Sequence, residues 1–228
     1  YFYFDNKNMP NKHWPLMIKR SLNILSFIKY LDKVNQFIPG GNKHIAILNH
    51  FTSRDTRNYL IKTEPHIKFI DKEIKMGRDY LNQCGLLEGD KYVCVISRDS
   101  TFKNKYSNEG GRDWSYHSYR NSNIENYQKT INYLAEKEFF IFRMGKGVEK
   151  TIDASHTRVI DYANSVDRSD FLDIFLFANS HFTIGSEAGI ITSALAYRAP
   201  FVSPNVSAIE TFQTWHDNIL VILKKPLE

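Results

Sequence analysis

The stretch ANSHFTIGSEAGIITSALAYRAPFV, residues 178–202, predicts the fold of this chain. Its β-type residues at 181–184 are followed by Gly185, which permits a tight turn, and by Ser186, which can cap a helix. Residues 188–196 are mostly small or apolar and favour that helix, until a proline stops it ahead of a second strand. We therefore expect a strand, a turn, a helix and a strand, which together form one βαβ unit.

A helix that begins at the carboxyl end of a parallel strand directs free N–H groups and a partial positive charge toward whatever lies in front of it. Here those groups would come from Ser186, Glu187, Ala188 and Gly189. We expect a phosphate or another anion in front of them. An ordinary strand-to-helix turn, whose glycines only allow close packing, explains the same residues equally well.

Length and composition indicate a globular protein with a substantial core. The chain has 228 residues, of which 42% are hydrophobic and 24% are charged, so it holds one large domain or one complete domain with part of another. Its cysteines, Cys84 and Cys94, fit neither a disulfide scaffold nor a metal cluster and favour a reducing, cytoplasmic location. The sequence starts at YFYFD rather than at a methionine, so we expect a piece of a longer protein.

The net charge of +5 is spread along the chain and is not clustered into Lys/Arg runs. This distribution argues against a nucleic-acid surface, so we expect no nucleic-acid partner. It is compatible with an anionic small molecule or with a substrate at a membrane surface.

Apolar runs predict a doubly wound, Rossmann-like parallel sheet for residues 66–228. We expect strands near residues 92, 139, 158, 181, 200 and 219, with helices at 71–84, 124–136 and 171–178. The near-continuous apolar run at 92–96 fits a strand buried on both faces. Right-handed crossovers would place the carboxyl ends of 92–96, 139–142 and 181–184 at one edge of the sheet.

Residues 1–65 are expected to be the tail of an incomplete N-terminal domain. The apolar spacing from Pro15 to Phe37 predicts one long helix, and 44–48 predicts a short strand. These elements are too few to bury a core of their own, so we expect the segment to pack against the sheet domain. The boundary is expected at Pro65, which biases its neighbour away from helix.

Basic side chains follow the predicted strands at the edge where open α/β sheets bind ligands. Arg98 comes just after the strand at 92–96, while Arg143 and Lys146 lie at the end of the strand near 139. Together with the turn after 181–184, they can face one anionic ligand.

The segment 102–121 is irregular and polar, and long loops of this kind inside compact domains are usually functional. A carboxylate, a phenol, an imidazole and a guanidinium occur within eight of its residues, at Asp113, Tyr116, His117 and Arg120. These groups suit proton transfer and anion binding. A solvated excursion braced by its own aromatic residues is the alternative.

Several ordered motifs resemble one family of bacterial enzymes. In chain order they are RDS at 98–100, D-x-x-YH-x-x-RN at 113–121, RMG at 143–145, DYA at 161–163, SDF-x-D at 169–173 and GS-x-AG at 185–189. Together they resemble a family of glycosyltransferases from bacterial surface-polysaccharide clusters. The last motif is also similar to the donor-binding segment of the lipopolysaccharide heptosyltransferases, although Glu187 stands where that pattern has an aspartate.

The resemblance implies a GT-B architecture, in which the second of two Rossmann-like domains holds most of the nucleotide-sugar donor. It implies no cofactor and no obligatory metal, and a glycan or lipid-linked acceptor. The enzyme would work in the cytoplasm, with peripheral association at the inner face of the membrane. Only the last part of the first domain, residues 1–65, would be present, so this chain would bind donor without completing turnover.

Sugar transfer gives the candidate residues their roles. Negative charge develops on the leaving pyrophosphate, and without a metal it needs fixed donors. The expected donor-binding set is Arg98, Arg120, Arg143, Lys146, Gly185, Ser186, Glu187, Ala188 and Gly189. The candidates for a base near the acceptor hydroxyl are Asp113, His117 and Asp99, which capping or bracing of the loop explains equally well.

Two other functions fit the same architecture. A non-catalytic nucleotide-binding or scaffold module of polysaccharide assembly would need no convergence of Arg98, Arg143 and Glu187 on one point. A sugar-nucleotide epimerase would need acid and base groups on both sides of a closed cleft.

Overall fold

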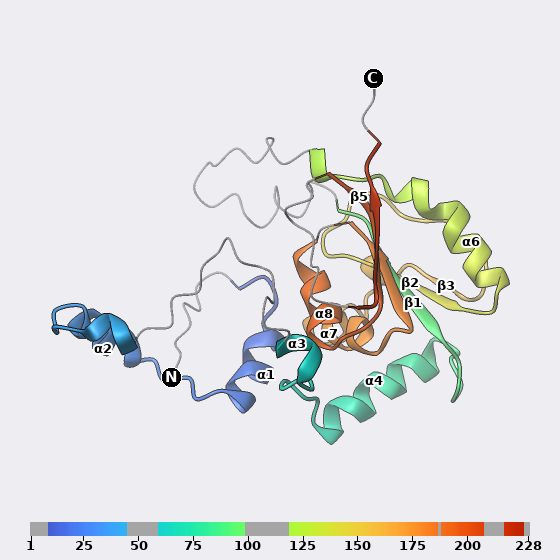
Figure 1. Cartoon of the computed structure of the whole chain (residues 1–228). Helices are drawn as coiled ribbons and strands as arrows, with labels where there is room; N and C mark the ends of the chain where they lie inside the picture. The colour runs from blue at the N-terminus through green and yellow to red at the C-terminus, as the bar shows by residue number, and fades with distance from the viewer. Residues whose placement is uncertain (1–8, 45–58, 99–118, 187, 208–216, 226–228) are drawn as a thin grey trace.

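The computed structural model of the chain describes residues 9–44, 59–98, 119–186, 188–207 and 217–225. Its centre is a six-stranded sheet in the order β3-β2-β1-β4-β5-β6, and all neighbouring strands are parallel (Figure 1). The strands are β1 Tyr92–Ile96, β2 Phe140–Met144, β3 Val159–Ile160, β4 Phe182–Gly185, β5 Phe201–Val206 and β6 Ile219–Leu223. The predicted α/β fold, with the strands at 92–96 and 181–184 near the centre of a parallel sheet, is confirmed.

Strand β1 is apolar throughout because both of its faces are covered. Each of its residues is at most 4% exposed. Successive side chains of a strand point to opposite faces, so Tyr92, Cys94 and Ile96 join one apolar cluster while Val93 and Val95 join the other. This double burial produces the continuous apolar run that the sequence displays.

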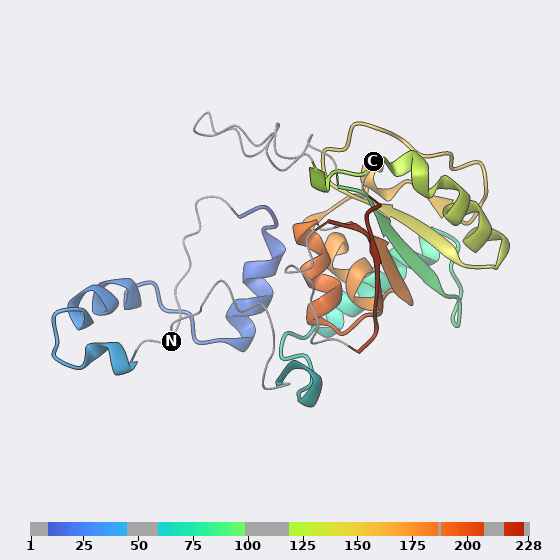
Figure 2. The ribbon, with the colours of Figure 1, turned by 45° about the horizontal axis from the view of Figure 1, so that its top comes forward.

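Helices cover both faces of the sheet, as Figure 1 and Figure 2 show. One face carries α4 Asp71–Gln83, α7 Asp170–Asn179 and α8 Thr192–Ala196, and the other carries the 3-10 helix η4 Ile124–Tyr127 and α6 Gln128–Glu136. Helices α4 and α7 approach closely at Gly77, where a Cβ atom would lie 2.2 Å from the ring of Phe175. The sheet is therefore the middle layer of three.

The single long helix predicted from Pro15 to Phe37 is wrong. The structure has two helices there, α1 His13–Ser21 and α2 Ile28–Asn35, with Leu22 between them in an extended conformation. At the end of α1, the hydroxyl of Ser21 donates a hydrogen bond to the carbonyl of His66 at 3.1 Å. The apolar spacing in the sequence continues beyond Leu22, although the helix does not. Such spacing alone does not indicate where the chain turns.

Helices α1 and α2 differ in burial. Helix α1 buries Pro15 and Met17 and packs on α7. The carboxylate of Glu73 in α4 accepts hydrogen bonds from His13 (2.8 Å) and Arg20 (2.7 Å). In contrast, α2 buries none of its residues and lies away from the sheet (Figure 1).

The remaining N-terminal elements are short. His44, the first residue of the strand predicted at 44–48, ends the 3-10 helix η2 Gly41–His44, and the rest of that predicted strand lies outside the described residues. Helix α3, Tyr59–Lys62, leads toward α4. Among the residues that the structure describes, no helix has the length and apolar character needed to cross a membrane.

Candidate functional site

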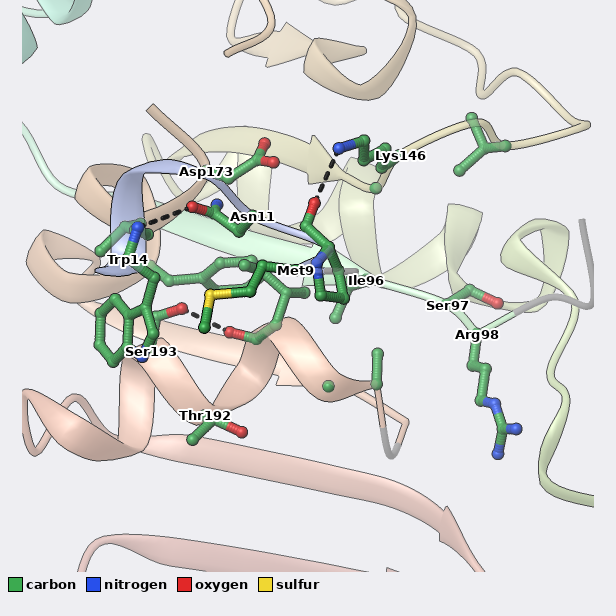
Figure 3. A pocket seen from close by; sticks show the side chains of 18 of the residues that line it. Met9, Asn11, Trp14, Ile96, Ser97, Arg98, Lys146, Asp173, Thr192 and Ser193 are labelled. Carbon is green, nitrogen blue, oxygen red and sulfur yellow. Dashed lines mark hydrogen bonds between the residues drawn. The ribbon is translucent and has the colours of Figure 1, made fainter. Parts of the chain in front are cut away.

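A pocket of about 540 Å³ lies at the carboxyl edge of the sheet (Figure 3). Its lining comes from the N-terminal segment, from the ends of β1 and β2, from α7, and from the chain after β4. The chain leaves β1 toward β2 and β3 on one side and returns to β4 on the other. The pocket therefore lies at the point where the strand order reverses, which is where open α/β sheets bind their ligands.

Gly185 lets β4 approach β1 at the base of this pocket. It pairs with Ile96 in the sheet register. A Cβ atom at Gly185 would lie 2.3 Å from Cγ2 of Ile96 and 3.0 Å from its carbonyl oxygen. A side chain does not fit there, so this glycine is needed for packing. Ala188 and Gly189 follow it and line the pocket.

Ser186 has another role than the helix cap that the sequence predicted. Its Oγ accepts a hydrogen bond from the backbone N–H of Arg98 at 2.9 Å and lies 3.1 Å from Oγ of Ser122, which in turn lies 3.0 Å from Oγ of Ser97. These buried or partly buried hydroxyls join the chain after β1 to the chain after β4 and to the segment at Ser122. The predicted N-cap role of Ser186 is wrong, because its hydroxyl accepts a hydrogen bond from the segment after β1 and the N-cap of the following helix is Ala188.

The helix expected over 188–196 is also shorter than predicted. A 3-10 helix, η6 Gly189–Ile191, comes first, with Ala188 as its N-cap, and α8 has only five residues. So short a helix has few aligned peptide dipoles with which to attract a phosphate. Any anion in the pocket has to be bound mainly by side chains.

Three of the predicted cations line the pocket: Arg98, Arg120 and Lys146. Arg98 follows β1 directly, and Lys146 follows β2. The ammonium group of Lys146 donates to the carbonyl of Pro10 at 2.8 Å and lies 3.3 Å from Oδ1 of Asp170. All three side chains thus lie at one pocket.

Arg143 does not line the pocket, contrary to the sequence-based expectation. Strand β2 continues to Met144, so Arg143 pairs with Val95 inside the sheet and is 1% exposed. Its Nη1 lies 3.5 Å from Oδ1 of Asp161, and its Nη2 donates to the carbonyl of Lys150 at 2.9 Å. Arg143 thus holds the connections around β3 together and has a structural role.

The N-terminal segment forms one wall of the pocket through Met9, Pro10, Asn11 and Trp14. Asn11 caps α1, because its Oδ1 accepts from the N–H groups of His13 (2.9 Å) and Trp14 (3.0 Å). Its Nδ2 donates to the carbonyl of Asp170 at 2.7 Å. The sequence-based expectations did not include this wall, although an asparagine ahead of an apolar helical pattern is a recognisable N-cap signal.

Asp173 is the buried acidic residue of the pocket. It lies on α7, and only 9% of its side chain is exposed. Its Oδ2 accepts a hydrogen bond from Nη2 of Arg168, whereas its Oδ1 has no hydrogen-bond partner among the described residues. Burial raises the pKa of Asp173 to about 6, although the nearby Arg168 acts in the opposite direction. The sequence placed Asp173 in a motif but gave it no role.

Asp99, Asp113, His117 and Glu187 lie outside the described residues. Within the described part of the chain, no group of three or more His, Cys, Asp or Glu side chains is arranged to hold a metal ion.

Comparisons of this chain with protein-family models, with curated proteins and with solved structures gave no match.

Proposed function

We propose that this chain is the donor-binding part of a glycosyltransferase, which transfers a sugar from a nucleotide-sugar donor to a glycan or lipid-linked acceptor of a bacterial surface polysaccharide. The observation that carries the proposal is a pocket with basic side chains at the point where the strand order reverses, between β1 and β4. Dinucleotide-binding domains with the same strand order hold a pyrophosphate at this point. The resemblance of the motifs narrows the ligand to a nucleotide sugar.

The composition of the pocket supports a ligand with both ring and phosphate groups. Its volume of about 540 Å³ is within the usual range for small-molecule sites. Trp14, Ile96 and Phe177 supply apolar surface for a base or for the apolar face of a sugar. Arg98 and Arg120 supply guanidinium groups, which bind phosphate oxygens through paired hydrogen bonds.

The same cations suit the chemistry of sugar transfer. When the acceptor oxygen bonds to the anomeric carbon of the sugar, the bond between that carbon and the diphosphate of the donor breaks, and negative charge develops on the leaving nucleoside diphosphate. Guanidinium and ammonium groups fixed near those oxygens stabilise this charge more strongly in the transition state than in the ground state. Arg98 and Arg120 are proposed for this role. Asp113, His117 and Asp99 stay the proposed candidates for the base.

A thermal-shift screen tests the proposal. The ligands are UDP, GDP, ADP, CDP, UDP-glucose and GDP-mannose, and the free nucleosides serve as controls without phosphate. A ligand at 100 times its dissociation constant stabilises the folded state by about 2.7 kcal/mol. We expect at least one phosphorylated ligand, and none of the nucleosides, to raise the melting temperature. Failure of all the phosphorylated ligands would contradict the proposal.

Turnover separates the transferase from a non-catalytic nucleotide-binding module. A transferase given an acceptor releases nucleoside diphosphate from the nucleotide sugar, whereas a module only binds the nucleotide sugar. The readout is therefore the release of UDP or GDP.

A further inference from the structure

We propose that Asp173 accepts a hydrogen bond from a hydroxyl group of a sugar ring in the bound ligand. This inference rests on the proposed function, because it takes the ligand to be a nucleotide or a nucleotide sugar. It assigns the recognition of sugar hydroxyls to a residue of α7.

The first support is the unused oxygen of the Asp173 carboxylate. The side chain lines the pocket and is 9% exposed, and its buried Oδ1 has no partner at hydrogen-bonding distance among the described residues. The phenol of Tyr162 lies near enough to lower the pKa of Asp173, but its hydroxyl donates to the carbonyl of Ser169 at 3.1 Å. Buried polar atoms are nearly always hydrogen-bonded in native proteins, so an oxygen left over at the wall of a pocket is explained by a partner that arrives with the ligand. A carboxylate oxygen accepts hydrogen bonds only, and hydroxyl groups are the commonest donors of a sugar.

The second support is that Arg168 fixes the carboxylate in position. Arg168 donates to Oδ2 of Asp173 and, through Nε, to the carbonyl of Gly145 at 3.1 Å. Its Nη2 also lies 3.5 Å from Oδ1 of Asp170. A carboxylate held through one oxygen on a helix presents the other in a defined direction, as recognition of a single hydroxyl requires.

The third support is the distribution of charge along the pocket. Figure 3 shows Asp173 and Arg98 at opposite ends of it, with Lys146 at the same end as Asp173. The carboxylates of Asp173 and Asp170 are paired with Arg168 and Lys146, so the charges at that end offset one another. The phosphates are therefore expected near Arg98, and an uncharged, hydroxyl-bearing ring near Asp173. The pocket would thereby fix the direction in which the ligand lies.

The position of Asp173 is also costly to the fold. Burial disfavours its ionised form, as the raised pKa indicates. Groups that are held ionised against such a penalty occur preferentially at functional sites.

The test is calorimetric titration of UDP, GDP, ADP and CDP, of their 2′-deoxy and 3′-deoxy forms, and of UDP-glucose and GDP-mannose. The proteins are the wild-type chain, Asp173→Asn and Asp173→Ala. Asp79→Asn is the matched control, because Asp79 lies on the exposed side of α4, where it pairs with Lys75. Comparing two ligands on the same protein cancels any general effect of a substitution on folding.

If the hydroxyl belongs to the ribose, the wild-type chain should bind a ribonucleotide roughly 10- to 150-fold more tightly than one of its deoxy forms, as a hydrogen bond to a charged group implies. Asp173→Ala should bring this ratio close to one. If it belongs to the transferred sugar, Asp173→Ala should instead weaken binding of the nucleotide sugar relative to its nucleoside diphosphate. Either result supports the inference.

If neither ratio changes in the Asp173 variants while the wild-type chain binds nucleotide, the inference is overturned and the proposed function stands. If no nucleotide or nucleotide sugar binds the wild-type chain, both are overturned.

Discussion

Replacing Asp173 by asparagine is expected to make the chain less sensitive to pH. Burial raises the pKa of Asp173 from the ordinary value of 3.8 to about 6. The difference corresponds to about 3 kcal/mol, since each pH unit is worth 1.36 kcal/mol. Arg168, Asp170 and Tyr162 are the charged or titratable groups that act on it.

The direction of this pH dependence follows from the number of protons bound by the folded and by the unfolded chain. Below pH 3.8 the carboxyl group is protonated in both the folded and the unfolded chain, so ionisation of Asp173 costs the folded chain no stability there. Between pH 3.8 and about 6 the folded chain keeps a proton that the unfolded chain has released, so the free energy of unfolding decreases as the pH rises. Asparagine never ionises. Relative to the wild-type chain, Asp173→Asn should therefore gain up to about 3 kcal/mol of stability between pH 4 and pH 8.

Urea denaturation followed by tryptophan fluorescence measures this difference at a series of pH values. Asp170→Asn is the control on the same helix. Although burial acts in the other direction, the N–H group of Lys12 and the ammonium group of Lys146 hold the pKa of Asp170 below its ordinary value. Its carboxylate therefore stabilises the folded chain above pH 3.8, and Asp170→Asn should be less stable than wild type there. A relative stability of Asp173→Asn that stays constant from pH 4 to pH 8, or that decreases, would show that the pKa of Asp173 is not raised in the folded chain.

Three further substitutions test the structural roles. Gly185→Ala should lower the free energy of unfolding by roughly 1–3 kcal/mol, because the new Cβ overlaps Ile96; an unchanged urea midpoint would contradict this. Glu73→Gln should weaken the attachment of α1, because the carboxylate that binds His13 and Arg20 loses its charge, and limited proteolysis should then cleave α1 faster than in wild type; equal rates would argue against it. Arg143→Met should cost roughly 3–5 kcal/mol, since it leaves the carboxylate of Asp161 without its buried partner. If Arg143→Met still folds, it should keep its nucleotide affinity in calorimetry, and a large loss would return Arg143 to the binding site.

The strands were predictable from sequence because an apolar run reports burial directly. β1 is apolar at each position, and the structure buries each position. The cap of α7 was predictable for a similar reason, since Ser169 needs only its own helix: its Oγ accepts from the N–H of Leu172 at 3.2 Å. Such features depend on neighbours in the chain or on the average environment.

The roles of Arg143 and Ser186 depend on partners far away in the sequence. An arginine after four apolar residues looks like the end of a strand, and only the pairing of β2 with β1 shows that the strand continues past it. Likewise, a serine after a glycine looks like a helix cap, and only the position of Arg98 shows that its hydroxyl is already used. Asp173 was missed because the burial of a single carboxylate is set by tertiary packing.

Binding of a nucleoside diphosphate at Arg98 tests most directly whether this pocket is a nucleotide site. Arg98 lines the pocket immediately after β1. The measurement is calorimetric titration of UDP, GDP, ADP and CDP into wild type, Arg98→Ala and the charge-matched control Lys75→Ala, whose side chain is 76% exposed on α4. A hydrogen bond from a guanidinium to phosphate is worth about 1.5–3 kcal/mol, so Arg98→Ala should raise the dissociation constant of the bound nucleotide by roughly 10- to 150-fold. Lys75→Ala should leave it unchanged. Equal affinities of wild type and Arg98→Ala, or no binding of any nucleoside diphosphate to wild type, would show that this pocket does not bind a nucleoside diphosphate through Arg98.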